Sequence, residues 1–191
     1  MARFNAFEQL LREEHVRQNL VSAASLEDVW RRHFADSAQL LRFVPASDSS
    51  IVDLGSGAGF PGLVLAALHG GPVTLVEERR LRVEFLRRAA QLLAVEVEIV
   101  AAKAERLASR PFDVITARAF APLPRLLALG ARFSTINTIW VLPKGRNAQS
   151  ELEALGSSWQ GDFGLEPSLT DPDARIIVAR RVEPKASRKS A

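Results

Sequence analysis

A cluster of glycines marks the part of the chain where chemistry is most strongly indicated. Gly55, Gly57, Gly59 and Gly62 follow an apolar run that begins at Ile51, and Pro61 stands where a helical stretch begins. Glycine lets a ligand approach the backbone where a Cβ would clash, and proline is favourable at the start of a helix. The pattern predicts a nucleotide-like ligand at the turn between a strand and a helix.

The spacing of these glycines separates three kinds of nucleotide site. Gly57, Gly59 and Gly62 fit the dinucleotide pattern GxGxxG, but that register starts two residues after the strand has ended at Gly55. Read from Gly55 instead, with Asp53 in the end of the strand, the loop has the form found in enzymes that use S-adenosylmethionine (SAM). No GKS or GKT triplet follows the loop, which excludes a Walker loop for a triphosphate.

An acidic side chain stands where the second strand is expected to end. Glu77 follows Asp53 by 24 residues and is itself followed by Glu78. Neighbouring strand tips of a parallel sheet converge on one crevice, so a carboxylate here can accept both ribose hydroxyls of an adenosine. The alternative is that the two acids begin a helix and pair with arginines between 79 and 82. The combination of loop and acid favours the ribose role for Glu77.

Two further residues are expected at the same crevice. Glu105 follows the third strand, where its side chain could reach an adenine edge while the amide of Ala104 offers a donor; a plain surface acid is the alternative. Arg118 lies at the tip of the fourth strand, which neighbours the first in a sheet of order 3-2-1-4-5. An ion pair with Glu105 or Asp53 is the structural alternative for Arg118.

These side chains need a parallel sheet to bring them together, and the sequence predicts one. Short β-branched runs alternate with helical stretches from residue 50, which is typical of a sheet covered on both faces. Two final runs, about 160–169 and 174–182, have only a turn-like segment between them and predict a closing antiparallel hairpin. The expected strands cover residues 50–54, 73–77, 96–100, 113–117 and 136–142. The expected helices cover residues 61–69, 79–94, 122–132 and 147–157.

The segment before the sheet predicts two amphipathic helices. The first covers residues 3–20, and the second runs from a cap at Ser25, with Asp28 three residues on, up to Pro45. We expect three parts in the chain: a helical cap (1–48), the ligand-binding domain (49–183) and a basic disordered tail (184–191).

Composition narrows the class of protein further. The chain has 191 residues, of which 47% are hydrophobic, enough for one globular domain with a full core. It has no cysteine, which excludes disulfides, thiolate zinc sites and a covalent thiol mechanism, and its three histidines lack metal spacing. No apolar run is long enough for a membrane helix, and the charged first 15 residues do not resemble a targeting signal. We therefore expect a cytoplasmic protein without a metal.

Taken together, the motifs resemble one family, the bacterial small-subunit ribosomal RNA guanine-N7 methyltransferases called RsmG or GidB. The likeness covers roughly residues 19–145. Its segments are NLVS at 19–22, RRHFADS at 31–37, DLGSGAGFPG at 53–62, RVEFL at 82–86, AE at 104–105, FDVITARAFAPL at 112–123 and PKG at 143–145. The resemblance implies a Rossmann-like α/β fold of the class I SAM-dependent methyltransferases, with a mostly parallel seven-stranded sheet, a final antiparallel hairpin and an N-terminal two-helix cap.

The resemblance also assigns residues to two partners. It implies cofactor contacts at Gly55, Phe60, Ala104, Glu105 and Arg118, beside Asp53, Gly57, Gly59 and Glu77 from the loop and strand tip. It places Arg32, His33, Asp36, Lys144 and Arg146 near the RNA. Two features depart from the family pattern. Where many relatives read NLT, this chain reads NLVS at 19–22. The chain is also short after its last strand. The implied substrate is 16S ribosomal RNA or the 30S particle, and we expect the protein to act as a monomer.

The expected chemistry is methyl transfer to guanine N7, which needs no general base because N7 carries a lone pair and no proton. Orientation of N7 in line with the methyl group would supply most of the catalysis. We expect Arg118 and Lys144 to orient the base or stabilise charge, contacting O6 or phosphate and leaving N7 free. Transfer to cytosine or uracil C5 is excluded without cysteine, and no Asn/Asp-Pro-Pro-aromatic motif for exocyclic amines follows the fourth strand.

Two other functions remain open from the sequence. One is a nicotinamide-dependent oxidoreductase that uses the Gly57, Gly59, Gly62 register, although the chain has no tyrosine and no evident group poised for hydride chemistry. The other is a non-catalytic RNA-binding or assembly protein with the same fold.

Overall fold

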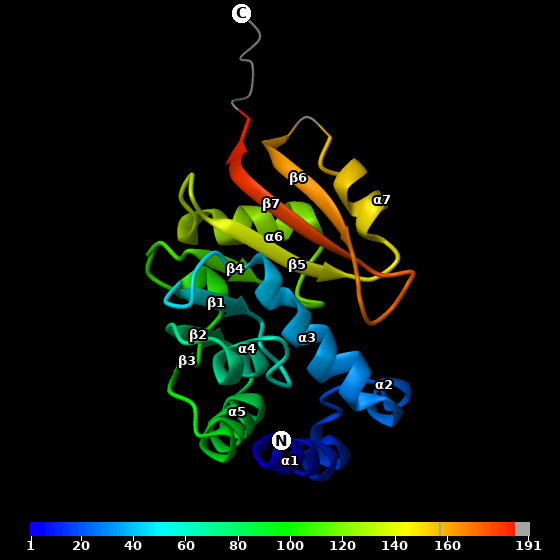
Figure 1. The fold of residues 1–191 in the computed structure, drawn as a ribbon. Coiled ribbons are helices and arrows are strands. Elements are labelled where there is room, and N and C mark those ends of the chain that lie inside the picture. Colours follow the sequence, from blue (N-terminus) through cyan, green and yellow to red (C-terminus); the bar gives the residue numbers. More distant parts are fainter. Residues whose placement is uncertain (157, 186–191) are drawn as a thin grey trace, which may run out of the picture.

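A seven-stranded sheet forms the centre of the computed structural model, which describes residues 1–156 and 158–185 (Figure 1). The strands are β1 (Ile51–Leu54), β2 (Val73–Val76), β3 (Val97–Val100), β4 (Val114–Thr116), β5 (Ile139–Lys144), β6 (Trp159–Pro167) and β7 (Arg175–Pro184). Their order is β3-β2-β1-β4-β5-β7-β6, and only the pairs made by β7 are antiparallel. This confirms both the predicted order of the first five strands and the closing hairpin.

Alternating side chains of the central strands supply two hydrophobic cores, one on each face of the sheet. Ile51 and Val52, neighbours in β1, belong to different apolar clusters, because successive residues of a strand point to opposite faces. Trp140 in β5 is fully buried in the second cluster. Burial on both faces explains why these strands read as short, continuous apolar runs.

The α-helices are divided between the two faces, and short 3-10 or π turns complete the connections. The α-helices are α1 (Ala2–Gln18), α2 (Ala23–Glu27), α3 (Asp36–Ala38), α4 (Gly62–Leu68), α5 (Arg80–Leu93), α6 (Leu123–Gly130) and α7 (Ala148–Glu153). The π-helix is η1 (Trp30–Ala35). The 3-10 helices are η2 (Gln39–Phe43), η3 (Ala104–Arg106) and η4 (Ala131–Phe133). Helices α1, α4 and α5 pack on one core, and α6 and α7 pack on the other. None of the described helices is sufficiently long and apolar to cross a membrane.

The segment predicted as one helix from Ser25 to Pro45 is broken, and that prediction was wrong. It consists of α2, the π-helix η1, a single turn α3 and the 3-10 helix η2. The cap residue is also different: Ser22 has extended backbone angles, and its hydroxyl accepts the hydrogen bond from the Ser25 amide. Ser25 therefore lies inside the first turn, where its hydroxyl donates to the Ser22 carbonyl oxygen.

The first helix is attached to the main body through both apolar and charged contacts. Phe7 is fully buried and its ring stacks on Phe60, with centroids 5.3 Å apart. Arg88 of α5 donates to Glu14 of α1 at 2.8 Å. The helices before residue 48 thus share a core with the sheet.

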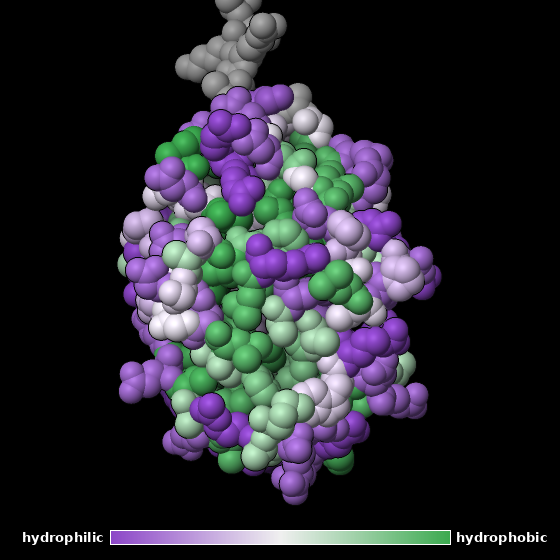
Figure 2. Space-filling model, in the orientation of Figure 1, coloured by the Kyte–Doolittle hydropathy of each residue, from purple (hydrophilic) through white to green (hydrophobic). Residues whose placement is uncertain are grey.

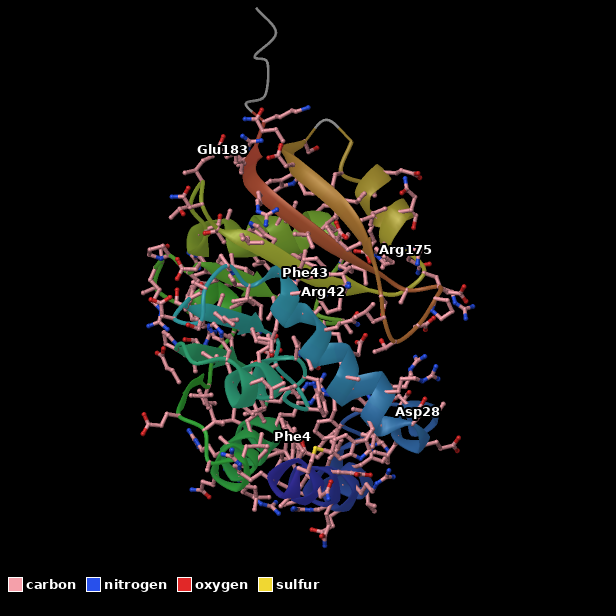
Figure 3. The ribbon with its side chains drawn as sticks, viewed as in Figure 1. Phe4, Asp28, Arg42, Phe43, Arg175 and Glu183 are labelled. Atoms are coloured by element: carbon pink, nitrogen blue, oxygen red, sulfur yellow. The ribbon has the colours of Figure 1, made fainter. Side chains whose placement is uncertain are left out.

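The broken helix also touches the far hairpin, through a polar network that the sequence did not predict. Asp36 accepts from the Thr170 hydroxyl at 2.7 Å, and Arg42 donates to the Pro167 carbonyl oxygen at 2.8 Å. Gln39 donates to Ser168 and accepts from the Leu169 amide. Figure 3 labels Arg42 and Phe43 at the end of this segment and Arg175 at the start of β7. These bonds hold the loop between β6 and β7 beside the residues of α3 and η2.

Apolar side chains are exposed along a band on one face of the molecule, flanked by hydrophilic residues (Figure 2). A shallow groove of about 440 Å³ lies among the apolar side chains of α1, η1 and α4, including Phe4, Trp30 and Leu68. It shares no lining residue with the cavities beside the glycine loop. Of the predicted tail, Pro184 belongs to β7, and residues 186–191 lie outside the described part of the chain.

Candidate functional site

The glycine loop after β1 is held against the end of β2 by backbone hydrogen bonds. The amides of Gly55 and Ser56 both donate to the Val76 carbonyl oxygen, at 2.9 and 3.0 Å. Gly55, Gly57 and Gly59 have positive φ angles, a conformation that residues with a Cβ rarely adopt. A Cβ on Gly55 would overlap the ring of Phe120. The loop therefore requires glycine for both its backbone shape and its close approach to the segment after β4.

Glu77 lies directly beneath this loop. Its carboxylate accepts from the Gly57 amide at 3.0 Å through Oε2 and from the Arg79 amide at 2.8 Å through Oε1. Only 5% of the residue is exposed, but it lines a cavity of about 320 Å³ together with Ala104 and Glu105. The structure thus places Glu77 and the AE pair around the same cavity.

One arginine of α5 lies at the site. Arg82 lies in the first turn of α5, and its side chain is only 25% exposed. Its guanidinium is 3.8 Å from Glu77 Oε2, and it lines the cavities on both sides of the glycine loop. The pairing of Glu77 with an arginine between 79 and 82, stated above as the alternative, is therefore present together with the placement of Glu77 at the cavity.

Asp53 is placed under the loop and has no exposed surface. Its Oδ2 accepts from the Gly62 amide at 3.1 Å, at the first residue of α4. Its Oδ1 has no partner among the described residues, and burial raises the pKa of the Asp53 carboxyl to about 7. Asp53 therefore stabilises the turn between β1 and α4 through its bond to Gly62. It does not line the cavities beside the glycine loop.

A second cavity, of about 490 Å³, extends from the other side of the glycine loop toward the N-terminal segment. Phe60, His33 and Arg118 lie together in its wall. The His33 ring stacks on Phe60 with centroids 4.9 Å apart, and the Arg118 guanidinium lies over the same ring, 5.3 Å from its centroid. Phe60 therefore joins the glycine loop to one residue from η1 and one from the tip of β4.

His33 is held as a neutral ring. Its Nε2 lies 3.0 Å from the Ser25 hydroxyl, and the residue is 6% exposed. Burial, reinforced by the nearby Arg118 and Arg32 cations, lowers the pKa of His33 to about 3. His33 sits in the π-helix η1, an irregularity often found at functional sites.

Arg118 faces the N-terminal segment and not the two acids named as its structural alternatives. Its Nη1 lies 4.0 Å from Asp36 Oδ2 and donates to the Arg32 carbonyl oxygen at 3.3 Å. Burial lowers the pKa of the Arg118 guanidinium, while Asp36 and Asp53 act in the opposite direction. The following residue, Ala119, has a positive φ of 52°, which marks a strained turn at this strand tip.

The remaining predicted residues lie around the outer part of the site. Lys144 ends β5 with a side chain that is 8% exposed, and its Nζ donates to Glu151 Oε2 at 2.8 Å. Arg32 and Arg146 are more exposed and pair with Asp171 and Asp173 in the β6–β7 loop, at 3.3 and 3.2 Å. Glu105 pairs with Arg125 at 3.7 Å. Arg32 and Lys144 line the larger cavity, whereas Arg146 does not.

The structure adds two residues that sequence reasoning missed. Phe120 covers Gly55, and Glu151 fixes Lys144. Phe120 lies within the motif at 112–123 but was given no role, and Glu151 lies in no motif. Both roles depend on contacts between distant segments. Within residues 1–156 and 158–185, no cluster of three or more histidine or acidic side chains is arranged to hold a metal ion.

Comparison with known proteins agrees with this architecture. The chain matches the family model described as GidB, rRNA small subunit methyltransferase G, over residues 1–170. The ribosomal RNA small subunit methyltransferase G of Rhizorhabdus wittichii is 51% identical over 97% of this chain and 87% of that protein. The protein of the same name from Erythrobacter litoralis is 52% identical over 94% of this chain and 88% of its own length.

Solved structures of lower sequence identity share the fold. An MtNAS variant in complex with S-adenosylmethionine has a TM-score of 0.64 at 18% identity, over 94% of this chain and 74% of that one. A putative O-methyltransferase from Klebsiella pneumoniae has a TM-score of 0.63 at 18% identity, over 92% and 89% of the two chains. The predicted Rossmann-like fold of class I methyltransferases is confirmed. By its sequence and its architecture, the chain belongs to the rRNA small subunit methyltransferase G family.

Proposed function

We propose that this protein transfers a methyl group from SAM to N7 of a guanine in the 16S ribosomal RNA of the small subunit. Family membership supports the ribosomal RNA substrate. The observation that carries the cofactor assignment is the hydrogen bond from the Gly57 amide to Glu77, because it joins the glycine loop and the acidic strand tip at one cavity.

The residues around the two cavities fit SAM. Ala104 and Glu105 would hold the adenine in the smaller cavity, with Glu77 at the ribose. Gly55 and Gly57 would let the cofactor lie against the backbone, while Gly59, which packs against Leu63, would shape the turn. Phe60 and Arg118 would flank the methionine part in the larger cavity. Asp53 would support the turn. The combined size of the cavities, about 320 and 490 Å³, is within the range usual for cofactor sites.

When bound, SAM supplies an electrophilic methyl group on a positively charged sulfur. The chain's own task is then to orient the base, because guanine N7 already carries the attacking lone pair. Arg118 and Lys144 lie at the tips of β4 and β5, where donors could contact O6 or a phosphate without occupying N7. The neutral His33 fits a packing and positioning role and needs no proton transfer. Orientation of this kind can contribute about 7 to 11 kcal/mol.

The mouth of the larger cavity would face the RNA. Arg32, His33 and Lys144 line it, and Arg146 follows Gly145 of its wall. Arginine suits phosphate recognition. We also propose that residues 1–48 act as a cap on the catalytic domain of residues 49–183, and that the protein works as a cytoplasmic monomer without a metal.

Methyl transfer to small subunits tests this function. Purified protein is incubated with labelled SAM and with small subunits from cells that lack it, and subunits from wild-type cells serve as the control. We expect label in the RNA of the first sample only. Binding to subunits with no transfer would support the non-catalytic alternative, and tight NADH binding without SAM binding would support the oxidoreductase alternative.

A further inference from the structure

A third cavity, of about 500 Å³, lies at the carboxyl ends of β4 and β5. Residues 118–122 form one wall, residues 143–145 form another, and Glu151 of α7 closes the far side. Arg118 and Lys144 are shared with the larger of the two proposed cofactor cavities, and Phe120 is shared with the smaller one. Anything bound here would therefore lie directly beside the proposed SAM site.

The wall of this cavity contains a charged pair with an unused acceptor. Glu151 Oε2 accepts from Lys144 Nζ at 2.8 Å and from the Leu123 amide at 2.9 Å. No described residue donates a hydrogen bond to Glu151 Oε1, and 26% of the side chain is exposed. Lys144 Nζ has one further partner, the Ala121 carbonyl oxygen at 3.3 Å. A cationic donor and a free carboxylate oxygen thus stand side by side.

This arrangement is complementary to guanine and opposed to adenine. Guanine carries the acceptor O6 beside the donors N1–H and N2–H₂, whereas adenine carries a donor at N6 beside the acceptor N1. With guanine, the ammonium group would face the acceptor O6 and the carboxylate would face the donors N1–H and N2–H₂. With adenine, the ammonium group would face the donor N6 and the carboxylate would face the acceptor N1. Enzymes that modify a base commonly read its Watson–Crick edge in such a pocket after the base leaves the helix.

We propose that this cavity is the binding pocket of the target guanine, in which Glu151 Oε1 accepts from N1–H and N2–H₂ while Lys144 donates to O6. The inference rests on the proposed function and deepens it, since it names the group that selects the base. With Lys144 on O6, N7 is left without a donor on the edge that would face the cofactor cavities. Phe120, half-buried in the wall shared with the smaller cavity, offers an aromatic surface to the base.

An inosine substitution tests this pocket, because inosine is guanosine without the N2 amino group. The methylated position is first mapped on guanine-containing small-subunit RNA, and a second RNA then carries inosine at that position. We expect the wild-type protein to methylate the guanine RNA about tenfold faster, in kcat/KM, than the inosine RNA. The Glu151→Gln variant should be slower on guanine RNA by about tenfold and should treat the two RNAs nearly alike.

Two controls separate recognition from folding. Glu153, on the same helix, is exposed and accepts from Gln149, so Glu153→Gln should keep the wild-type ratio. The Glu151→Gln variant should keep the wild-type affinity for SAM. If that variant does not fold, Glu151→Asp, whose carboxylate is too short for the contact, should also lose the preference for guanine.

The outcomes distinguish this proposal from the function on which it rests. Equal guanine-to-inosine ratios for the wild-type protein and the Glu151→Gln variant would overturn the pocket while leaving methyl transfer intact. A wild-type protein that methylates neither RNA would overturn the proposed function and the pocket with it.

Discussion

The carboxylate of Glu77, at the end of β2, accepts a hydrogen bond of 3.0 Å from the amide of Gly57 in the loop after β1. Two segments separated by a whole helix are joined at the point where the proposed ribose site lies. The Arg82 cation, 3.8 Å from the same carboxylate, adds a positive charge at that junction.

The Glu77→Ala variant should bind SAM more weakly by about 1 to 3 kcal/mol, because it loses charge-assisted hydrogen bonds. Isothermal titration calorimetry measures this change directly. Glu84→Ala is the matched control, since Glu84 is an acid on α5 that pairs with Arg80 and does not line either cofactor cavity. Unchanged affinity in the Glu77 variant would contradict the ribose role.

The Gly55→Ala variant should lose stability and SAM affinity together. Its new Cβ would overlap Phe120, and φ of +75° is unfavourable for alanine, so a loss on the order of 1 to 3 kcal/mol is expected in urea unfolding. Adding Phe120→Ala should restore part of the loss by making room. Gly164→Ala, in β6, where the added Cβ would meet no atom closer than 3.6 Å and which lines neither cofactor cavity, should behave like the wild type. A Gly55→Ala protein with wild-type unfolding and SAM affinity would rule out this steric account.

His33 should make the protein less stable in acid. Its pKa in the folded state, about 3, lies below the ordinary value of 6.5, so the unfolded chain binds the extra proton first as pH falls. Its stabilising contribution is complete above pH 6.5 and decreases by about 2 kcal/mol on going to pH 5. Urea unfolding across this range should show a shallower pH dependence for His33→Gln. Parallel curves for the two proteins would show that His33 does not stay neutral in the fold.

Asp53 should have the opposite effect. Its carboxyl has a pKa of about 7 in the folded state against 3.8 ordinarily, so the folded chain holds the proton more tightly. The stability it contributes is present below pH 3.8 and is lost as pH rises through 7, amounting to about 4 kcal/mol in full. Relative to the wild type, Asp53→Asn should become more stable between pH 4 and pH 8 in urea unfolding. A constant difference between the two proteins would refute the raised pKa.

The sheet and the glycine loop were predictable from sequence because their signals are local. Short β-branched runs define β1 and β2, and glycines at Gly55 and Gly57 mark the turn that the backbone makes there. Glu77 could be placed because the strand tips of a parallel sheet meet at one edge. Family resemblance then added residues such as Phe60, which carries no such local signal.

The rest of the site depends on contacts between distant parts of the chain. The helical pattern before residue 45 contains no proline or glycine that would reveal the π-helix η1. Arg118 faces Asp36 because the N-terminal segment crosses the tip of β4. Gln39 bonds to the Ser168 hydroxyl because the hairpin loop lies against the same segment. Periodicity describes the faces of one element at a time, so it could not reveal these pairings.

The chemical identity of the product tests the central claim most directly. Small-subunit RNA methylated in vitro by the purified protein is digested to nucleosides and analysed by mass spectrometry against authentic methylated standards. The account predicts one new product, 7-methylguanosine, formed only when both SAM and the protein are present. A methyl group on any other atom or base, or none at all under conditions where SAM binds, would contradict it.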